Sequence, residues 1–162
     1  MKIWSLISEL EFSKLWRLAW IGVRNPLLVL PTHKATIKTM KICDKLYGSS
    51  HHAHNRANAF RHAFWNILIA KSVIVRLKSE EKTVAWAEKI TSLHEELMPN
   101  HPLEKEMDLH NNEVGRLVFK ELKAESIEAI IQFIKQKSEE AVQIKTVEET
   151  DKLKGVLVFI EE

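Results

Sequence analysis

The sequence predicts an all-α domain, a single compact bundle of five to six helices around a buried central helix. Apolar residues recur at helical spacing along most of the chain, and only four Gly and four Pro are present to form turns. The 162 residues, of which 45% are hydrophobic, are enough to bury one core without disulfides or structural metals. We therefore expect residues 1–162 to fold as one helical domain.

The first expected element is an amphipathic helix over residues 2–22, within an N-terminal segment of residues 1–24. Its aromatic residues are spaced at multiples of four and therefore lie near one face of the helix: Trp4, Phe12, Trp16 and Trp20. Tryptophan-rich helices can lie on a bilayer, but membrane-surface helices are usually basic, whereas this polar face mixes acids and bases. Packing on the domain is therefore favoured, and peripheral membrane contact through this helix is the alternative.

Turn signals separate the next two elements. Pro26 and Pro31 predict an extended connector, because a residue before proline avoids the helical conformation. A helix then runs from about Thr32 to Gly48, since glycine commonly follows the last residue of a helix. The helix at about 55–78 carries apolar side chains in nearly every direction, so we expect it to be the buried central helix.

Three further helices and a ribbon complete the prediction. One helix opens at Ser79 or Glu80 and runs to about residue 98, a second covers about 102–122, and a third covers about 126–137. Beyond them, the apolar runs "AVQIKTV" and "GVLVFIEE" flank an acidic, lysine-bearing turn. This pattern is typical of a small C-terminal β-ribbon.

Composition and charge exclude several classes of protein. With 24 Lys and Arg against 22 Asp and Glu, the net charge is +2, and there is no clear nucleic-acid footprint beyond a modest patch. Cys43 is the single cysteine, which excludes disulfide scaffolds and cysteine-rich zinc sites, and we expect it in the core. The sequence shows neither a signal peptide nor a transmembrane helix, so a cytoplasmic location is expected by default, with signal-less export left open.

A polar stripe runs along the helix predicted at 55–78. Asn58, His62 and Asn66 follow one another at a spacing of four residues and therefore share one face. Because core surrounds this helix, the stripe should be buried, where an unpaired amide or imidazole costs about 1–3 kcal/mol. The stripe therefore predicts polar partners on neighbouring helices.

The two following helices offer such partners. His94 projects into the apolar side of the helix at 80–98, with Glu95 on its flank. The helix at 102–122 brings further polar residues to its core side or beside it: Asp108, His110, Asn111 and Asn112. Metal and cofactor sites of helical bundles are built in this way, from side chains on facing helices. We therefore expect a buried polar site within residues 50–118.

These residue types suit a divalent metal, because imidazoles and carboxylates without a thiolate favour Zn, Mn or Mg. We expect His62, His94 and Asp108 to be the ligands, with Glu95 or His110 in support. The amides around them would orient these ligands: Asn58, Asn66, Asn111 and Asn112.

The expected chemistry is attack of a metal-activated water on an ester or phosphoester of a small molecule or lipid. Glu95 is then the candidate general base. His110 is a further catalytic candidate, and Arg61 or Arg116 would stabilise anionic charge.

Three alternatives stay open. The same residues can form a metal-free acid–base site, with His62 or His94 beside Asp108. They can also form a structural network that fixes the register of the core, in a protein that is not an enzyme. The third alternative is a membrane-surface protein that uses the tryptophan helix.

The loop before the central helix is rich in histidine. We interpret His51, His52 and His54 mainly as capping or surface residues, with His52 or His54 at the mouth of the site as the alternative. Asn55, which follows them, is the expected N-cap of the central helix.

Three segments, "NAFRHAFWN", "HEEL" and "MDLHNNEVGR", together resemble an uncharacterised bacterial family of domains of unknown function. The resemblance covers roughly residues 50–118, and the matching positions include those assigned to the site above. Domains of this kind also occur at the C-terminal ends of large secreted bacterial proteins of toxin-like architecture. The resemblance therefore implies an effector-like hydrolytic domain.

Overall fold

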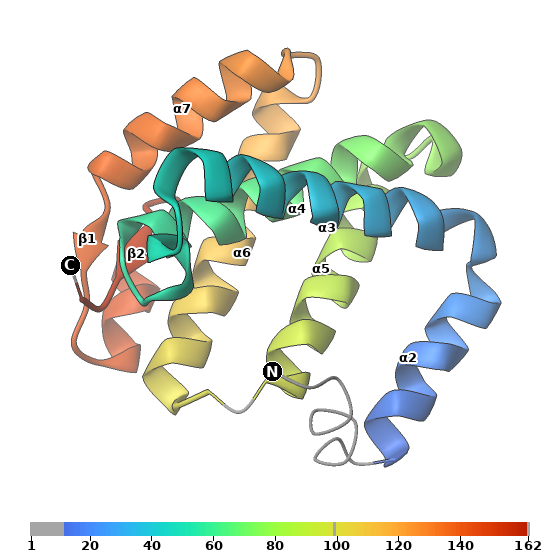
Figure 1. Ribbon diagram of the computed structural model, residues 1–162, viewed down its shortest axis with the longest axis horizontal. Coiled ribbons are helices and arrows are strands. Elements are labelled where there is room, and N and C mark those ends of the chain that lie inside the picture. Colours follow the sequence, from blue (N-terminus) through green and yellow to red (C-terminus); the bar gives the residue numbers. More distant parts are fainter. Residues whose placement is uncertain (1–11, 99, 162) are drawn as a thin grey trace.

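The computed structural model describes residues 12–98 and 100–161 (Figure 1), so Trp4 and the start of the helix expected at 2–22 lie outside the described residues. The described chain is an all-α bundle with a small two-stranded sheet near its C-terminal end. Its helices are α2 (Phe12–Arg24), α3 (Pro26–Tyr47), α4 (Arg56–Leu77), α5 (Glu80–Leu97), α6 (Pro102–Leu122) and α7 (Ile127–Glu139). Its shorter elements are the 3₁₀ helices η1 (Ser50–His52) and η2 (Val147–Lys152) and the strands β1 (Val142–Gln143) and β2 (Val158–Phe159).

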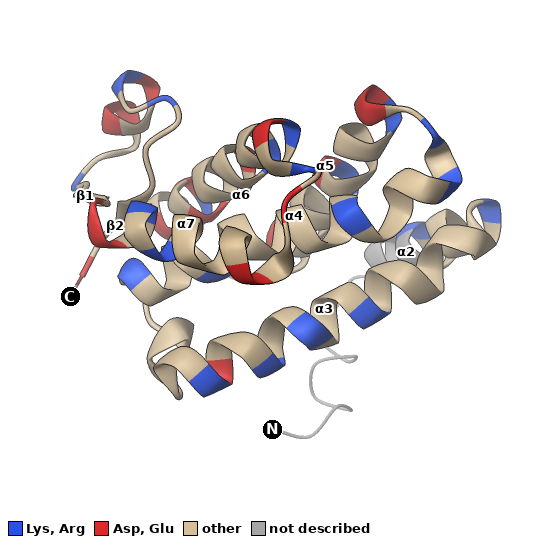
Figure 2. Cartoon of the chain, turned by 90° about the horizontal axis from the view of Figure 1, so that it is seen from above, with Lys and Arg blue, Asp and Glu red and all other residues tan. Residues whose placement is uncertain are grey.

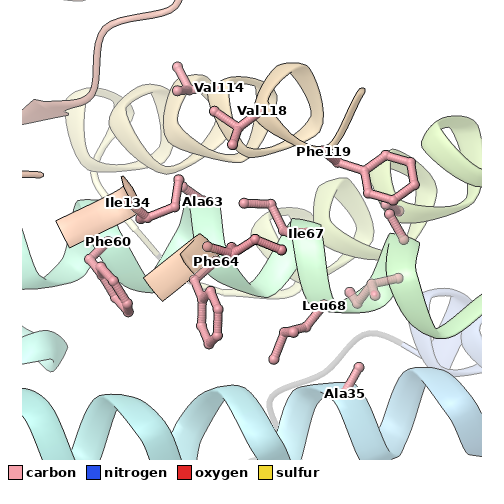
Figure 3. Packing of buried hydrophobic residues seen from close by; sticks show 14 of the residues in the cluster. Ala35, Phe60, Ala63, Phe64, Ile67, Leu68, Val114, Val118, Phe119 and Ile134 are labelled. Carbon is pink, nitrogen blue, oxygen red and sulfur yellow. The ribbon is translucent and has the colours of Figure 1, made fainter. Parts of the chain in front are cut away.

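Helix α4 is the buried centre of the bundle, as its pattern predicted. It packs against α3, α5, α6 and α7, and the side chains of Phe60, Phe64 and Ile67 are fully buried. Figure 3 shows these side chains between Ala35 of α3 and the residues of α6. The expected cap is also confirmed, because the side chain of Asn55 accepts hydrogen bonds from two backbone amides of the first turn.

Helices α4 and α6 approach each other at Gly115. A Cβ atom at this position would lie 2.7 Å from the Cα atom of Ala63 and closer still to the carbonyl oxygen of that residue. The two backbones are thus in direct contact, which only a residue without a side chain allows. This contact brings the polar faces of the two helices together.

The extended connector expected between Pro26 and Pro31 is wrong. Pro26 is instead the first residue of α3, a position where the missing N–H costs nothing, and Pro31 lies inside the same helix. Proline at 31 leaves the carbonyl group of Leu27 without its helical donor, but Leu27 is 75% exposed, so water can satisfy that carbonyl. The end of the helix near Gly48 is as predicted.

Helix α2 carries the two tryptophans of the described N-terminal segment. Ile21 packs into the core and Arg17 forms an ion pair with Glu96 of α5, but Trp16 and Trp20 are 64% and 47% exposed. The described part of the helix thus contacts the domain, as expected, but through Ile21 and Arg17 and not through these two tryptophans. Among the described residues, none of the helices combines the length and apolarity that crossing a bilayer requires.

The C-terminal ribbon is a pair of parallel strands, with Val142 opposite Val158 and Gln143 opposite Phe159. Parallel strands need a crossover connection, and here the chain passes through η2 between them. Val158 joins Ile144 and Met107 of α6 in a small apolar cluster. The segment after α7 thereby closes one end of the helical bundle.

Candidate functional site

Three ionisable side chains from three helices meet at the centre of the bundle. His62 of α4, Glu95 of α5 and Asp108 of α6 are 2%, 1% and 3% exposed, and their potential ligand atoms lie within 4.8 Å of one another. The Nδ1 atom of His62 is 3.5 Å from Oε1 of Glu95, and its Nε2 atom is 3.2 Å from Oδ1 of Asp108. The imidazole thus lies between two carboxyl groups.

Asn112 of α6 links the residues of the cluster. Its side-chain oxygen lies 2.6 Å from Nδ2 of Asn66, which donates to it, and 3.3 Å from Nδ1 of His62. Its side-chain nitrogen donates to Oε1 of Glu95 at 3.3 Å. Asn112 therefore connects α4, α5 and α6 through one amide.

Asn66 extends this network away from the cluster. Its side-chain nitrogen also donates to the backbone oxygen of His62, and its oxygen accepts from Oγ1 of Thr91 and Nη1 of Arg116, both at 3.3 Å. All four hydrogen-bonding positions of the Asn66 amide are thus engaged. The network therefore holds both amides in fixed orientations behind the cluster.

A cavity of about 330 Å³ opens in front of the cluster, and His62, Glu95 and Asp108 line it. Within the described part of the chain, Oε2 of Glu95 and Oδ1 of Asp108 are buried oxygens without a hydrogen-bond partner. Buried polar atoms are normally paired, and the exceptions commonly mark a functional role or a bound ion. The two oxygens are therefore acceptors that the described side chains leave unsatisfied.

Arg61 places a positive charge beside the cluster. Its Nη2 atom donates to Nε2 of His62 at 2.8 Å, and its Nη1 atom donates to Nδ1 of His52 at 3.3 Å. A neutral His62 ring that accepts at Nε2 carries its proton on Nδ1, where it faces Asn112 and Glu95. The arginine thus selects one tautomer of the central histidine.

Burial determines how these groups ionise. It lowers the pKa of His62 well below its usual range, with the charge of Arg61 adding to the effect. Burial also raises the pKa of Glu95, and burial followed by the charge of Glu95 raises the pKa of Asp108 to about 8. Near neutral pH, the structure therefore combines a neutral imidazole with a carboxyl pair that retains a proton.

Two further predicted residues lie in the cavity wall. His94 lines the cavity but lies outside the cluster, with its ring edge-on to Trp65 at 5.1 Å between centroids. Asn58 also lines the cavity, and its side-chain nitrogen donates to the backbone oxygen of Ala53 at 2.7 Å. The group of potential ligand atoms thus contains Glu95, the neighbour of His94, and not His94 itself.

Three other predicted residues do not line the cavity. His110 donates from Nε2 to the backbone oxygen of Val156, and Asn111 forms two hydrogen bonds of 2.9 Å with the backbone of Val158. Arg116 lies behind the network, 4.0 Å from a carboxylate oxygen of Glu88. His110 and Asn111 thus bind the C-terminal segment, and Arg116 donates to the side-chain oxygen of Asn66.

The histidines of the loop before α4 lie in different surroundings. His51 is fully buried, with Nε2 2.9 Å from a carboxylate oxygen of Asp44, so its assignment as a capping or surface residue is wrong. His52 and His54 line the cavity, as our alternative stated. Asn100, which we did not predict, also lines it and donates to Oδ2 of Asp108 at 3.4 Å. Only its place in the turn "MPNHP" could have signalled it.

The fold and the site together define a helical-bundle protein with a buried histidine–carboxylate site at the crossing of three helices. A family model described as a domain of unknown function (DUF6973) matches residues 19–142, and the chain belongs to this family. The matched residues include the whole cluster and stop before the segment that carries β2. No curated protein and no solved structure matches the chain.

Proposed function

We propose that the protein is a metal-dependent hydrolase of phosphoester bonds, or of ester bonds, with its reaction site in the cavity before the cluster. The observation that carries this proposal is the meeting of His62, Glu95 and Asp108, with ligand atoms within 4.8 Å and two carboxyl oxygens unpaired among the described residues. Imidazoles and carboxylates are ligands of catalytic divalent ions, which commonly keep three protein ligands and leave one position open for water. Zn, Mn or Mg bound there would satisfy both oxygens.

The geometry changes the roles that the sequence predicted. Glu95 is better placed as a ligand than as the general base, and a bound ion would supply an activated water molecule. His94 lines the same cavity, and burial, followed by the charge of Arg61, lowers the pKa of its imidazole. A neutral imidazole at this position can accept a proton, so we assign the general base to His94.

Arg61 favours a phosphoester over an uncharged ester. Its guanidinium group lines the cavity, so it can stabilise the negative charge of a phosphoryl oxygen. Trp65, Met40 and Met98 form apolar parts of the wall. The substrate that fits these walls is a small molecule, or a lipid fragment, with an anionic ester and an apolar group.

The biological setting follows from the resemblance of the three motif segments. They resemble bacterial domains that also occur at the C-terminal ends of secreted, toxin-like proteins, and His62, Glu95 and Asp108 all lie in these segments. An effector-like hydrolase that acts on a small molecule or lipid is the corresponding proposal. A cytoplasmic location by default stays a prediction.

One contact supports a second candidate, a hydrolase without a metal. Arg61 occupies Nε2 of His62 at 2.8 Å, the nitrogen nearest to Asp108, and a proton in the carboxyl pair can satisfy one of the unpaired oxygens. In this case Asp108 would act as a general acid and His94 as the base. Metal content separates the two candidates.

The test is elemental analysis of the full chain, purified without an affinity tag and incubated with Zn, Mn or Mg, together with hydrolysis of chromogenic phosphoesters and esters. Glu95→Gln and Asp108→Asn should lose a near-stoichiometric metal and the hydrolysis. The matched control Glu121→Gln, which changes an exposed residue of α6, should retain both. Hydrolysis without metal that is lost in Asp108→Asn would favour the second candidate. A folded protein with neither metal nor hydrolysis would leave the network a structural one.

A further inference from the structure

The outer face of α3 combines apolar and basic residues. Its members recur at spacings of three and four and therefore share one side of the helix. They are Leu27, Leu30, Lys34, Ile37, Lys38, Lys41 and Lys45, all exposed. Figure 2 shows the basic residues along the length of α3. The opposite side of the helix faces the core through residues such as Ala35 and Cys43. The outer face is thus separate from the cavity of the candidate site.

The apolar members of this face are unusually accessible. Leu27, Leu30 and Ile37 are 75%, 58% and 42% exposed, and they lie among the lysines or directly before them. Helix α2, with its exposed Trp16 and Trp20, joins α3 just before this point. An exposed apolar patch that is surrounded by basic residues is typical of an interaction surface.

A groove beside the outer face adds further positive charge. It has a volume of about 370 Å³ and lies between α3, α4 and the start of α7. Its cationic lining residues are Lys34, Lys38, Lys71 and Arg76. Leu30, Leu68 and Ile127 supply apolar parts of its wall, and no carboxylate of the described residues lines it. The groove therefore suits an anionic group attached to an apolar one.

We infer that the outer face of α3, with the cationic groove beside it, docks on an anionic lipid bilayer. Aliphatic side chains can enter the boundary between headgroups and acyl chains, while the lysines extend to the lipid phosphates. Surfaces for single-stranded nucleic acids instead combine basic residues with aromatic side chains on which bases stack, whereas α3 presents leucine and isoleucine. The inference does not depend on the proposed hydrolase activity.

The test measures flotation of the full chain with vesicles of phosphatidylcholine alone or with added phosphatidylglycerol. The wild type should bind the anionic vesicles and should dissociate from them as the salt concentration is raised. The variant Lys34→Gln/Lys38→Gln/Lys41→Gln should bind at least about tenfold more weakly, because each lysine near an anionic surface contributes to binding. Its matched control removes three exposed lysines elsewhere: Lys82→Gln/Lys89→Gln/Lys152→Gln.

The apolar contribution is tested separately. Leu27→Asn/Leu30→Asn should weaken vesicle binding severalfold, because their aliphatic area no longer enters the bilayer. The control Val75→Asn/Val147→Asn changes two exposed apolar residues outside the face and should bind normally. Equal losses in both lysine variants would overturn the inference. So would a wild type that fails to float, including one that forms a dimer through this face or binds DNA instead.

Discussion

Asp108 keeps its proton in the folded protein at pH values where an exposed aspartate is ionised. Burial, and then the charge of Glu95, raise its pKa from 3.8 to about 8. Between these two pH values the folded chain binds more protons than the unfolded chain, so the free energy of unfolding falls as pH rises. We expect Asp108→Asn to remove this fall and to stabilise the metal-free protein, relative to the wild type, by on the order of 1 kcal/mol for each pH unit between about 5 and 8.

Urea unfolding at several pH values, in the presence of a chelator, measures this effect. Asp151→Asn, which changes an exposed aspartate of η2, is the control and should follow the pH dependence of the wild type. A wild type and an Asp108→Asn variant with parallel pH dependence would show that Asp108 ionises normally in the folded protein.

The residues of the site could be predicted as a set but not one by one. His110, Asn111 and Asn112 are consecutive, and successive residues of a helix point about 100° apart, so they cannot share one environment. Asn112 forms a hydrogen bond with Glu95 of the cluster, while His110 and Asn111 bond to the C-terminal segment. Hydrophobic periodicity does not reveal where that segment lies. The same angle separates His94 from Glu95. Packing of α5 against its neighbours, rather than any local pattern, turns Glu95 inward.

At the scale of the elements, the crossing of α4 and α6 depends on Gly115. We expect Gly115→Ala to destabilise the fold by about 3 kcal/mol or more, because the new methyl group would overlap the backbone of Ala63 and force the helices apart. The two helices carry His62 and Asp108, so metal binding or hydrolysis should weaken with stability. Thermal and urea unfolding measure the change.

Gly22→Ala is the matched control for this prediction. Its Cβ would meet only a side-chain methyl of Val29 at 3.7 Å, an ordinary contact, and alanine favours the helix by up to about 1 kcal/mol. The variant should therefore be neutral or slightly stabilised. Equal effects of the two substitutions would contradict the role assigned to Gly115.

Most helices could be predicted because capping residues and hydrophobic periodicity agree along them. Ser79 and Asn55 both cap helices through their side chains, as their residue types predicted. The first turns of α3 were mispredicted because Pro31 disfavours a helix interior, whereas Pro26 suits the first helical position and burial of Leu28 and Ala35 favours the helix through packing. Tertiary contacts therefore decided the element where local preferences conflicted.

At the scale of the whole molecule, the C-terminal segment is coupled to the wall of the cavity. The side chain of Asn111 forms hydrogen bonds with the backbone of Val158. A little further along the chain, the backbone amides of Ile160 and Glu161 donate to the backbone oxygen of His54. His54 lines the cavity. Hydrogen bonds thus connect α6, β2 and the histidine-rich loop.

Asn111→Ala should therefore have effects at both ends of this connection. It leaves two backbone groups of Val158 without partners, which costs about 2–3 kcal/mol, and it should speed hydrogen exchange in β2 and in residues 49–55. Hydrogen exchange read by mass spectrometry measures this, with Glu113→Ala, an exposed residue of the same helix, as the control. Faster exchange in β2 alone would show that the loop is held independently.

The backbone contact between Gly115 and Ala63 also governs how the molecule can move. His62 is the neighbour of Ala63, and Asn112 lies one helical turn before Gly115, so the cluster lies beside the point where α4 and α6 have least freedom to slide or separate. Small motions of the two helices then pivot about that point and displace the cluster least. The ionisable groups of the cluster should therefore keep a nearly fixed spacing, and adjustment to a ligand is expected at the cavity residues outside the long helices, such as His52, His54 and Asn100.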